Sequence, residues 1–319
     1  MEISTRTGAA MSLPENRGEH ETCQSASGAA CKRAKMIGTK LQVTHITLFE
    51  YASPVIDSVN TLHLEPRTFP FQRTISSTIR ILPSTRLRRF SDLFQNITHH
   101  FEIVQPHQKL EVHSRIRVHN LPLIVPERSM EATKAELADP STRERTWSFL
   151  QDSTLVAHHS EIWRLAIDLT EGMTSLHEQA MAFMSWIHQN FHYQPGATRV
   201  NTRLEQAYEI RAGVCQDFTH MMIALCRAVG LPARYASGYL YNGPTDLLVG
   251  AQASHAWCEV YLPHVGWIGY DPTNNNLADE RYVKVAVGRD YDDVAPIKGA
   301  YRGTAHCAMT VKVVVEKID

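Results

Sequence analysis

The stretch RAGVCQDFTHMMIALCRAVGLPARY, residues 211–235, decides the fold of the second half of the chain. Its apolar residues recur every three or four positions, which predicts a helix with one buried face; they are Val214, Phe218, Met221, Leu225 and Val229. Gly230 followed by Pro232 predicts the end of this helix, because glycine suits a left-handed cap and proline cannot continue the helix. Cys215 then lies in the first turn.

The position of Cys215 has a chemical consequence. The unpaired N–H groups and the dipole at a helix N-terminus stabilise a thiolate, which is the reactive form of cysteine. Cys226 lies near the other end of the same predicted helix, where the dipole opposes a thiolate. We therefore take Cys215 as the candidate nucleophile and interpret Cys226 as a small buried core residue, as most cysteines are.

A histidine and an aspartate follow in the stretch ASHAWCEVYLPHVGWIGYDPTNNN, residues 253–276. Its alternation predicts two strands joined by a turn, with His255 and Trp257 on one face of the first strand and Asp271 on the second. His255 and Asp271 then point to the same side if the connecting loop has an odd residue count, and they lie opposite or diagonal to one another. The sequence leaves this register open.

Cys215, His255 and Asp271 together form a candidate catalytic triad. An imidazole can take the proton of a thiol, and a carboxylate on the far ring nitrogen fixes the tautomer and steadies the imidazolium. Separate elements carry the three residues, so they can converge in space. The order alone is a weak signal, because 17 histidines offer many accidental triples.

The first half of the chain, from Leu41 to about Asn120, has a hydrophobic period of two. Such alternation predicts antiparallel strands with one buried face and one wet face, as in a β-sandwich. After residue 165 the period becomes 3.6, and Ser175 with Glu178 forms a capping box ahead of an apolar helical stripe. Thr202 and Glu205 repeat that signature before a shorter helix. The predicted class is α+β.

These patterns predict a division of the chain into four parts. Residues 1–40 are rich in Ser, Gly, Ala and charge without periodicity, and we expect a disordered leader that contains Cys23 and Cys31. The expected parts that follow are an N-terminal β domain at 41–125, a connector with helical pieces at 126–165 and a catalytic domain at 166–319.

Composition narrows the class of partners. Lys and Arg number 32 against 33 Asp and Glu, so the chain has no global field to concentrate nucleic acid or acidic lipid, and we expect neither as a partner. We find no apolar run long enough to span a membrane and no secretory signal. The expected setting is the cytoplasm, with all six cysteines as thiols.

Two groups of residues are weak candidates for a metal site. Asp290, Asp292 and Asp293 lack the spacing, the glycine and the distal glutamate of an EF-hand, so we interpret them as a structural loop. Four histidines in the first half fall at the wet positions of predicted strands rather than at a ligand spacing; they are His99, His100, His113 and His119. We expect neither a metal nor an organic cofactor.

Three stretches together resemble the bacterial transglutaminase-like family: residues 213–240, 254–275 and 285–301. The resemblance runs from about Leu41 to the C-terminus, and the first half is similar to that family's N-terminal β domain. It implies a papain-like core, in which a helix that carries the cysteine packs on an antiparallel sheet. It further implies that Cys215 is the nucleophile, His255 the base and Asp271 the residue that orients the base.

The resemblance also implies a reaction, in which a thiolate attacks an amide carbonyl and forms a thioester that is released to water or to an amine. Papain-like enzymes use a side-chain donor upstream of the cysteine for the oxyanion, and Tyr193 is the candidate, beside the backbone N–H of Cys215. Trp257, Trp267 and Tyr239 are candidates for the walls of a substrate channel.

Hydrolysis of a peptide or amide bond is the predicted activity, and the expected substrate is a peptide or protein amide. Two alternatives remain open. One is acyl transfer to an amine, of the protein-glutamine gamma-glutamyltransferase type. The other is a binding protein with a vestigial triad, against which the intact Cys215, His255 and Asp271 argue.

Overall fold

The computed structural model describes residues 38–243, 248–250, 254–304 and 306–319. Most of the predicted leader, with Cys23 and Cys31, lies outside these residues. Thr39 and Lys40, at the end of the predicted leader, already belong to the first strand, β1 (Thr39–Glu65). The predicted α+β class is confirmed, with strands first and a mixed helical and strand core after them.

A curled antiparallel sheet forms around the 27 residues of β1. The first half of β1 pairs with β5, and the second half pairs with β4 after a shift in register between Glu50 and Val55. Apolar residues that lie between the two halves, such as Val55, Leu62 and Phe101, are buried in one core, as a sandwich requires. The other strands are β2 (Gln72–Leu82), β3 (Arg88–Ser91), β4 (Ile97–Ile103) and β5 (His107–Asn120).

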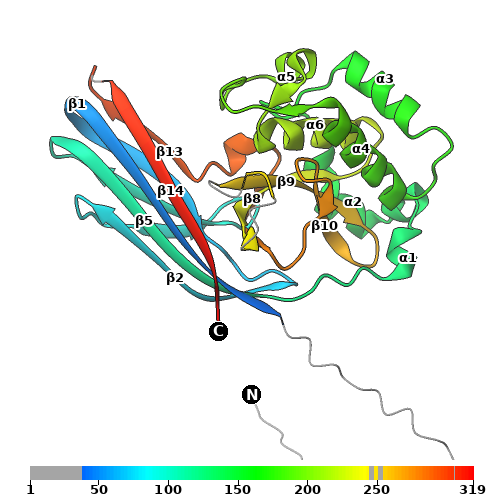
Figure 1. Cartoon of the computed structure of the whole chain (residues 1–319), viewed down its shortest axis with the longest axis horizontal. Coiled ribbons are helices and arrows are strands. Elements are labelled where there is room, and N and C mark those ends of the chain that lie inside the picture. The colour runs from blue at the N-terminus through cyan, green and yellow to red at the C-terminus, as the bar shows by residue number, and fades with distance from the viewer. Residues whose placement is uncertain (1–37, 244–247, 251–253, 305) are drawn as a thin grey trace, which may run out of the picture. The chain divides into compact units, whose positions relative to one another are not determined.

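The last two strands of the chain complete this sheet. β13 (Ile297–Arg302) and β14 (Cys307–Ile318) both pair with β1, in a register that sets Lys40 opposite Ile318 (Figure 1). The division predicted from sequence placed residues 297–318 with the catalytic core. They return to the N-terminal sheet because β1 offers them a free edge, which a local pattern does not reveal.

The second half of the chain is built on another antiparallel sheet, the core sheet, in the order β11-β10-β9-β8-β12. Helices α4 and α6 pack on one face of it, and α3 packs on both helices (Figure 1). Ala256, Cys258 and Val260 of β9 face α6, as the alternation predicted. The elements are α3 (Ser160–Leu169), α4 (Leu176–Asn190), α6 (Cys215–Ala228), β8 (Ala233–Leu240), β9 (His255–Leu262), β10 (Gly266–Asp271), β11 (Asn276–Leu277) and β12 (Tyr282–Gly288).

The helix signals are confirmed in two cases and wrong in a third. Helix α6 ends before Gly230, which has a positive φ of 78°, and the Ser175 hydroxyl caps α4 by accepting the N–H of Glu178. Thr202 accepts the N–H of Arg199 instead, and α5 (Leu204–Ile210) begins without a side-chain cap. The connector contains the short helices α1 (Glu127–Met130), η1 (Lys134–Ala138), α2 (Pro140–Thr146) and η2 (Trp147–Leu150).

The face of the second sheet away from α6 packs on the N-terminal sheet, where Tyr239, Val283 and Val285 contact Leu41 and Ile116. Side-chain amides of the N-terminal strands bind the edge strand β12 at three places. Asn96 both donates to the carbonyl of Val287 and accepts its N–H, each at 2.8 Å. Gln72 does the same at Lys284, and Asn120 donates to the carbonyls of Glu280 and Tyr282. Side-chain amides of the same chain therefore bind the edge strand of the core sheet, which is otherwise open for pairing.

No helix in the residues that the structure describes is both long and apolar enough to cross a membrane.

Candidate active site

Cys215 is the first residue of α6, and Asp217 holds the turn before it. The Asp217 carboxylate accepts the N–H of Val214 at 2.8 Å and the hydroxyl of Thr198 at 2.7 Å. Burial raises the pKa of Asp217, and these hydrogen bonds oppose that rise. Cys215 itself is 8% exposed, so the helix N-terminus presents a nearly buried thiol.

His255 and Asp271 lie at the ends of neighbouring strands. His255 opens β9 and Asp271 closes β10, and the ladder pairs Tyr270 with Cys258. Asp271 is therefore diagonal to His255, one of the two arrangements that the sequence left open. The imidazole Nε2 lies 2.8 Å from Oδ2 of Asp271, and both side chains are fully buried.

Three other residues donate hydrogen bonds to the Asp271 carboxylate. They are the Thr273 N–H at 2.9 Å, the Asn274 side-chain amide at 2.8 Å and the Tyr282 hydroxyl at 2.8 Å. Burial alone raises the pKa of Asp271, but His255 and these donors outweigh it and lower the pKa. Asp271 is thus an ionised acceptor with a fixed orientation.

The pKa of the His255 imidazole is raised, so the ring carries a proton at neutral pH. Burial lowers its pKa, but the Asp271 carboxylate, with a smaller contribution from the neighbouring Cys215, raises it to about 10. Its Nδ1 is buried and makes no hydrogen bond to the residues that the structure describes. Cys215 is near enough to the imidazole to affect its pKa, and the Asp271 carboxylate binds the Nε2 side of the ring.

Aromatic rings fix the orientation of the imidazole. Trp257 stacks on His255 with ring centroids 6.2 Å apart and an interplanar angle of 26°. Tyr282, which donates to Asp271, lies 5.9 Å from the imidazole centroid. A Cβ added to Gly269 would lie 3.0 Å from the Trp257 indole, so a glycine leaves the room that this ring needs.

Tyr193 lies beside the nucleophile. Its strand β6 (His192–Tyr193) pairs in parallel with β7 (Ala212–Gly213), and the register sets Tyr193 opposite Gly213. Burial, followed by the proximity of Cys215 and Asp271, raises the pKa of Tyr193 to about 12. The hydroxyl is therefore protonated at neutral pH and available as a hydrogen-bond donor.

Sequence reasoning missed several residues around Cys215, His255 and Asp271, including Tyr282 and Thr273, which donate to Asp271. Tyr235 and Tyr291 lie close enough to Cys215 that it contributes, after burial, to the rise of their pKa values. Asn274 joins Asp271 to Val249 through two further hydrogen bonds, and a Cβ on Gly250 would lie 2.7 Å from Nδ1 of His255. Asn274 had a signal, because asparagine three residues after a strand-end aspartate is typical of a side-chain capped turn.

Of the three predicted wall residues, Trp257 and Trp267 line one cavity on the face of the sheet away from α6, and Tyr239 does not. Trp257 stacks on His255, as described above. Trp267 packs against Phe149 with centroids 5.0 Å apart. Tyr239 is buried against the N-terminal sheet, where its hydroxyl lies 2.7 Å from Nδ1 of His45. The contacts of Tyr239 are those of a packing residue between the two sheets, because the ring faces away from the helix that carries Cys215.

Other titratable groups near the site have structural partners. His220 is buried, which lowers its pKa to about 3, and it accepts the N–H of Tyr291 at 3.1 Å. Asp290 accepts the N–H groups of Leu155 and Asp292. Asp293 pairs with Arg289. Among the described residues, no three His, Cys, Asp or Glu side chains converge as metal ligands would.

We expect Gly213→Ala to destabilise the protein by about 1–3 kcal/mol. A Cβ there would lie 2.3 Å from Oδ2 of Asp217, so the carboxylate must leave the turn that positions Cys215. Chemical denaturation measures the loss. In an Asp217→Gly background the same substitution should cost much less, because the clashing side chain, including its Cβ at 2.8 Å, has been removed. An equal cost in both backgrounds would contradict this explanation.

Comparison with known proteins gives two family matches. Residues 164–272 match the model of the transglutaminase-like superfamily, and residues 41–119 match the bacterial transglutaminase-like N-terminal region. An uncharacterised protein of Mycobacterium leprae is 32% identical over 293 residues, which cover 87% of this chain and 98% of that protein.

Two further similarities concern proteins with described activities. A protein-glutamine gamma-glutamyltransferase of Pseudomonas aeruginosa is 30% identical over 162 residues, which cover 47% of this chain and 23% of that protein. A solved structure from Cytophaga hutchinsonii, provisionally described as a cysteine protease, has a TM-score of 0.74 at 22% identity and covers 88% of this chain and 91% of that one. The second similarity shows a shared fold.

Proposed function

Because this chain belongs to the transglutaminase-like superfamily and carries the bacterial transglutaminase-like N-terminal region, we propose that it is a cysteine hydrolase of peptide or amide bonds. One observation carries the proposal. The buried pair of His255 and Asp271, 2.8 Å apart, lies near Cys215 at the start of α6, since that thiol contributes to the raised pKa of His255. A vestigial site has no need to keep a buried ion pair, which costs desolvation.

The first step forms a thioester. Cys215 transfers its proton to His255, and the sulfur attacks the carbonyl carbon of the amide. The oxyanion accepts hydrogen bonds from the N–H of Cys215 and from the Tyr193 hydroxyl, which its raised pKa keeps protonated. The carbon–nitrogen bond breaks, and the imidazolium gives its proton to the departing amine.

The second step releases the acyl group. Water attacks the thioester while His255 accepts its proton, and the carbon–sulfur bond breaks. The thiolate then leaves, and the acid product departs. Asp271 keeps its charge throughout, because its three other donors and the imidazolium hold it as a carboxylate.

Transfer to an amine is the second candidate function. It uses the same thioester and differs only in the nucleophile of the second step. The observation that favours it is the relative from Pseudomonas aeruginosa, which is described as a protein-glutamine gamma-glutamyltransferase. Water and amine compete for one acyl-enzyme, so one experiment tests both.

The test begins with p-nitrophenyl acetate and intact-mass spectrometry. An acetyl group should appear on the wild type and be absent from Cys215→Ala. Glutamine-containing peptides are then incubated with and without a primary amine. Conversion of amide to acid supports hydrolysis, and incorporation of the amine supports transfer. Acetylation that persists in Cys215→Ala would contradict the proposed nucleophile.

A further inference from the structure

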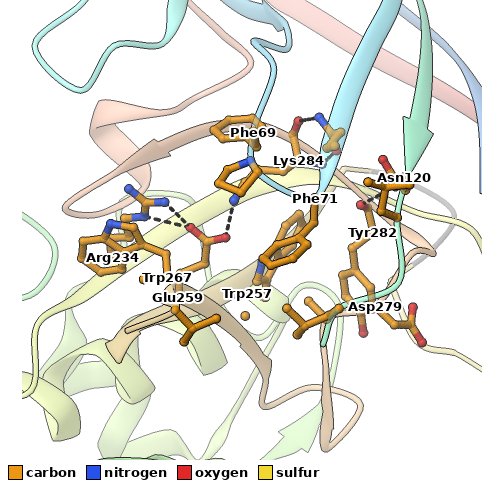
Figure 2. A pocket seen from close by; sticks show the side chains of 18 of the residues that line it. Phe69, Phe71, Asn120, Arg234, Trp257, Glu259, Trp267, Asp279, Tyr282 and Lys284 are labelled. Carbon is orange, nitrogen blue, oxygen red and sulfur yellow. Dashed lines mark hydrogen bonds and ion pairs between the residues drawn. The ribbon is translucent and has the colours of Figure 1, made fainter. Parts of the chain in front are cut away.

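A cavity of about 290 Å³ lies on the face of the core sheet away from α6 (Figure 2). Its walls come from β9, β10 and β12 and from the segment 67–72 of the N-terminal half. Cys215, His255 and Asp271 do not line it. The cavity is therefore a neighbouring space, since the lining residues Trp257 and Tyr282 also contact His255 and Asp271.

The charges in this cavity do not balance. The Glu259 carboxylate accepts two hydrogen bonds from Arg234, at 2.8 and 2.6 Å, and one from Lys284, as Figure 2 shows. Arg67 is a third cation in the lining. The carboxylate of Asp279 adds no compensation, because Arg281 binds it at 2.7 Å. Three cations thus face a single carboxylate.

Arg67 is the cation without an ionic partner among the described residues. Its Nε is buried and makes no hydrogen bond there, and its guanidinium lies 5.0 Å from the centroid of the Phe69 ring. Burial lowers the pKa values of Arg234 and Lys284, and Arg67 lowers them further. Cations this close together destabilise one another unless an anion compensates their charge.

Aromatic rings form a large part of the remaining lining. Phe69, Phe71, Trp257 and Trp267 surround the charged groups, and Lys284 lies 4.2 Å from the centroid of the Phe69 ring. Pro70 at the rim is exposed, so solvent molecules can reach the cavity. A concave site with aromatic walls and a few converging charges is typical of small-molecule binding, and this volume suits a small ligand.

We propose that the cavity binds a small organic carboxylate, with the carboxylate at Arg67 and Lys284 and the apolar part among the aromatic rings. A carboxylate supplies the missing negative charge and matches the donors of a guanidinium. The rings favour an apolar body over a fully hydrated ion such as phosphate. This inference is independent of the proposed function, because it concerns binding alone.

The test titrates the full chain with sodium benzoate, followed by calorimetry and by tryptophan fluorescence, to which Trp257 and Trp267 in the wall should respond. We expect saturable binding. Benzamide, which has the same shape without the charge, should bind at least about tenfold more weakly. Inorganic phosphate should not displace benzoate. Cys215→Ala should bind benzoate as the wild type does.

Arg67→Gln should weaken benzoate binding by about tenfold or more, and Arg67→Lys should retain part of the affinity. Arg73→Gln is the matched control, because Arg73 is exposed and does not line the cavity. Far-UV circular dichroism establishes that each variant is folded. Equal affinity for benzamide and benzoate, wild-type affinity in Arg67→Gln, displacement by phosphate, or loss of binding in Cys215→Ala would each overturn the proposal.

Discussion

His255→Ala is expected to slow the alkylation of Cys215 by iodoacetamide about 30–100-fold near pH 6. A thiol with an ordinary pKa of about 8.5 is roughly 0.3% thiolate at that pH, whereas a thiolate paired with an imidazolium is mostly ionised. Part of this gain is offset, because a stabilised thiolate is a weaker nucleophile. Site-resolved mass spectrometry after timed labelling measures the rate.

The pH dependence of the Cys215 alkylation rate should also differ between the wild type and His255→Ala. Because Asp271 raises the pKa of His255 to about 10, against the effect of burial, the imidazole stays protonated and the wild-type rate should be nearly flat between about pH 6 and 9. The His255→Ala rate should rise about tenfold per pH unit over most of that range. Asp271→Asn removes the charge that raises the pKa of His255, so its profile should resemble that of His255→Ala.

The same raised pKa affects the free energy of unfolding. A histidine whose pKa is higher in the folded state contributes stability that is complete below its unfolded value of about 6.5. That contribution is lost as the pH rises through the folded value of about 10. The free energy of unfolding of His255→Ala, measured by denaturation, should therefore fall less steeply with pH than that of the wild type between about pH 6.5 and 10.

Cys307 is an internal reference for labelling, because it is half-buried and lies outside the site, in β14. Cys226 and Cys258 are buried and should remain unlabelled in the folded protein. If His255→Ala leaves the Cys215 rate unchanged while Cys307, whose pKa burial raises, labels equally slowly in both proteins, the imidazole does not activate the cysteine. The catalytic proposal would then fail in favour of a binding role.

Glu259→Gln is expected to lower the free energy of unfolding by about 3–5 kcal/mol. The substitution keeps the shape of the side chain and removes the carboxylate that Arg234 and Lys284 share, so two largely buried cations lose their partner. The Glu259 side chain is only 4% exposed. Urea denaturation at neutral pH measures the change. A loss below about 1 kcal/mol would mean that solvent already compensates the two cations.

Glu50→Gln provides the matched control, because Glu50 pairs with Lys109 at the surface, where both side chains are about half exposed or more. It should change the stability by less than about 0.5 kcal/mol.

Lowering the pH should also destabilise the protein, by part of the amount expected for Glu259→Gln. Burial raises the pKa of Glu259, but Lys284 and Arg234 outweigh burial and lower it. The stabilisation is therefore complete above the usual glutamate range and lost as the pH falls through the lowered value.

Local patterns predicted the elements that carry the candidate triad. The period of 3.6 after Gly213 and the stop at Gly230 correctly defined α6, and the alternation in residues 255–262 correctly assigned the two faces of β9. The diagonal position of Asp271 relative to His255 remained open, because register depends on the turn and on packing rather than on period. The catalytic roles themselves stay a prediction.

Contacts between distant parts of the chain left no local signal. Asn96 and Gln72 read as ordinary polar residues among strands, yet each binds the backbone of β12 about 190 to 210 positions away. Arg67 lies in a turn and reaches a cavity whose other charges are on β8, β9 and β12. Such pairs follow from tertiary packing, which periodicity does not encode.

The pairing of β1 with β14 has a consequence for synthesis. Lys40 is synthesised well before its partner Ile318, because most of the described residues lie between them. The N-terminal sheet therefore cannot be completed until β14 has been synthesised, although the core between them is already available to fold. During that interval one edge of β1 is unpaired, and this is the period when a nascent chain of this design most needs protection from aggregation.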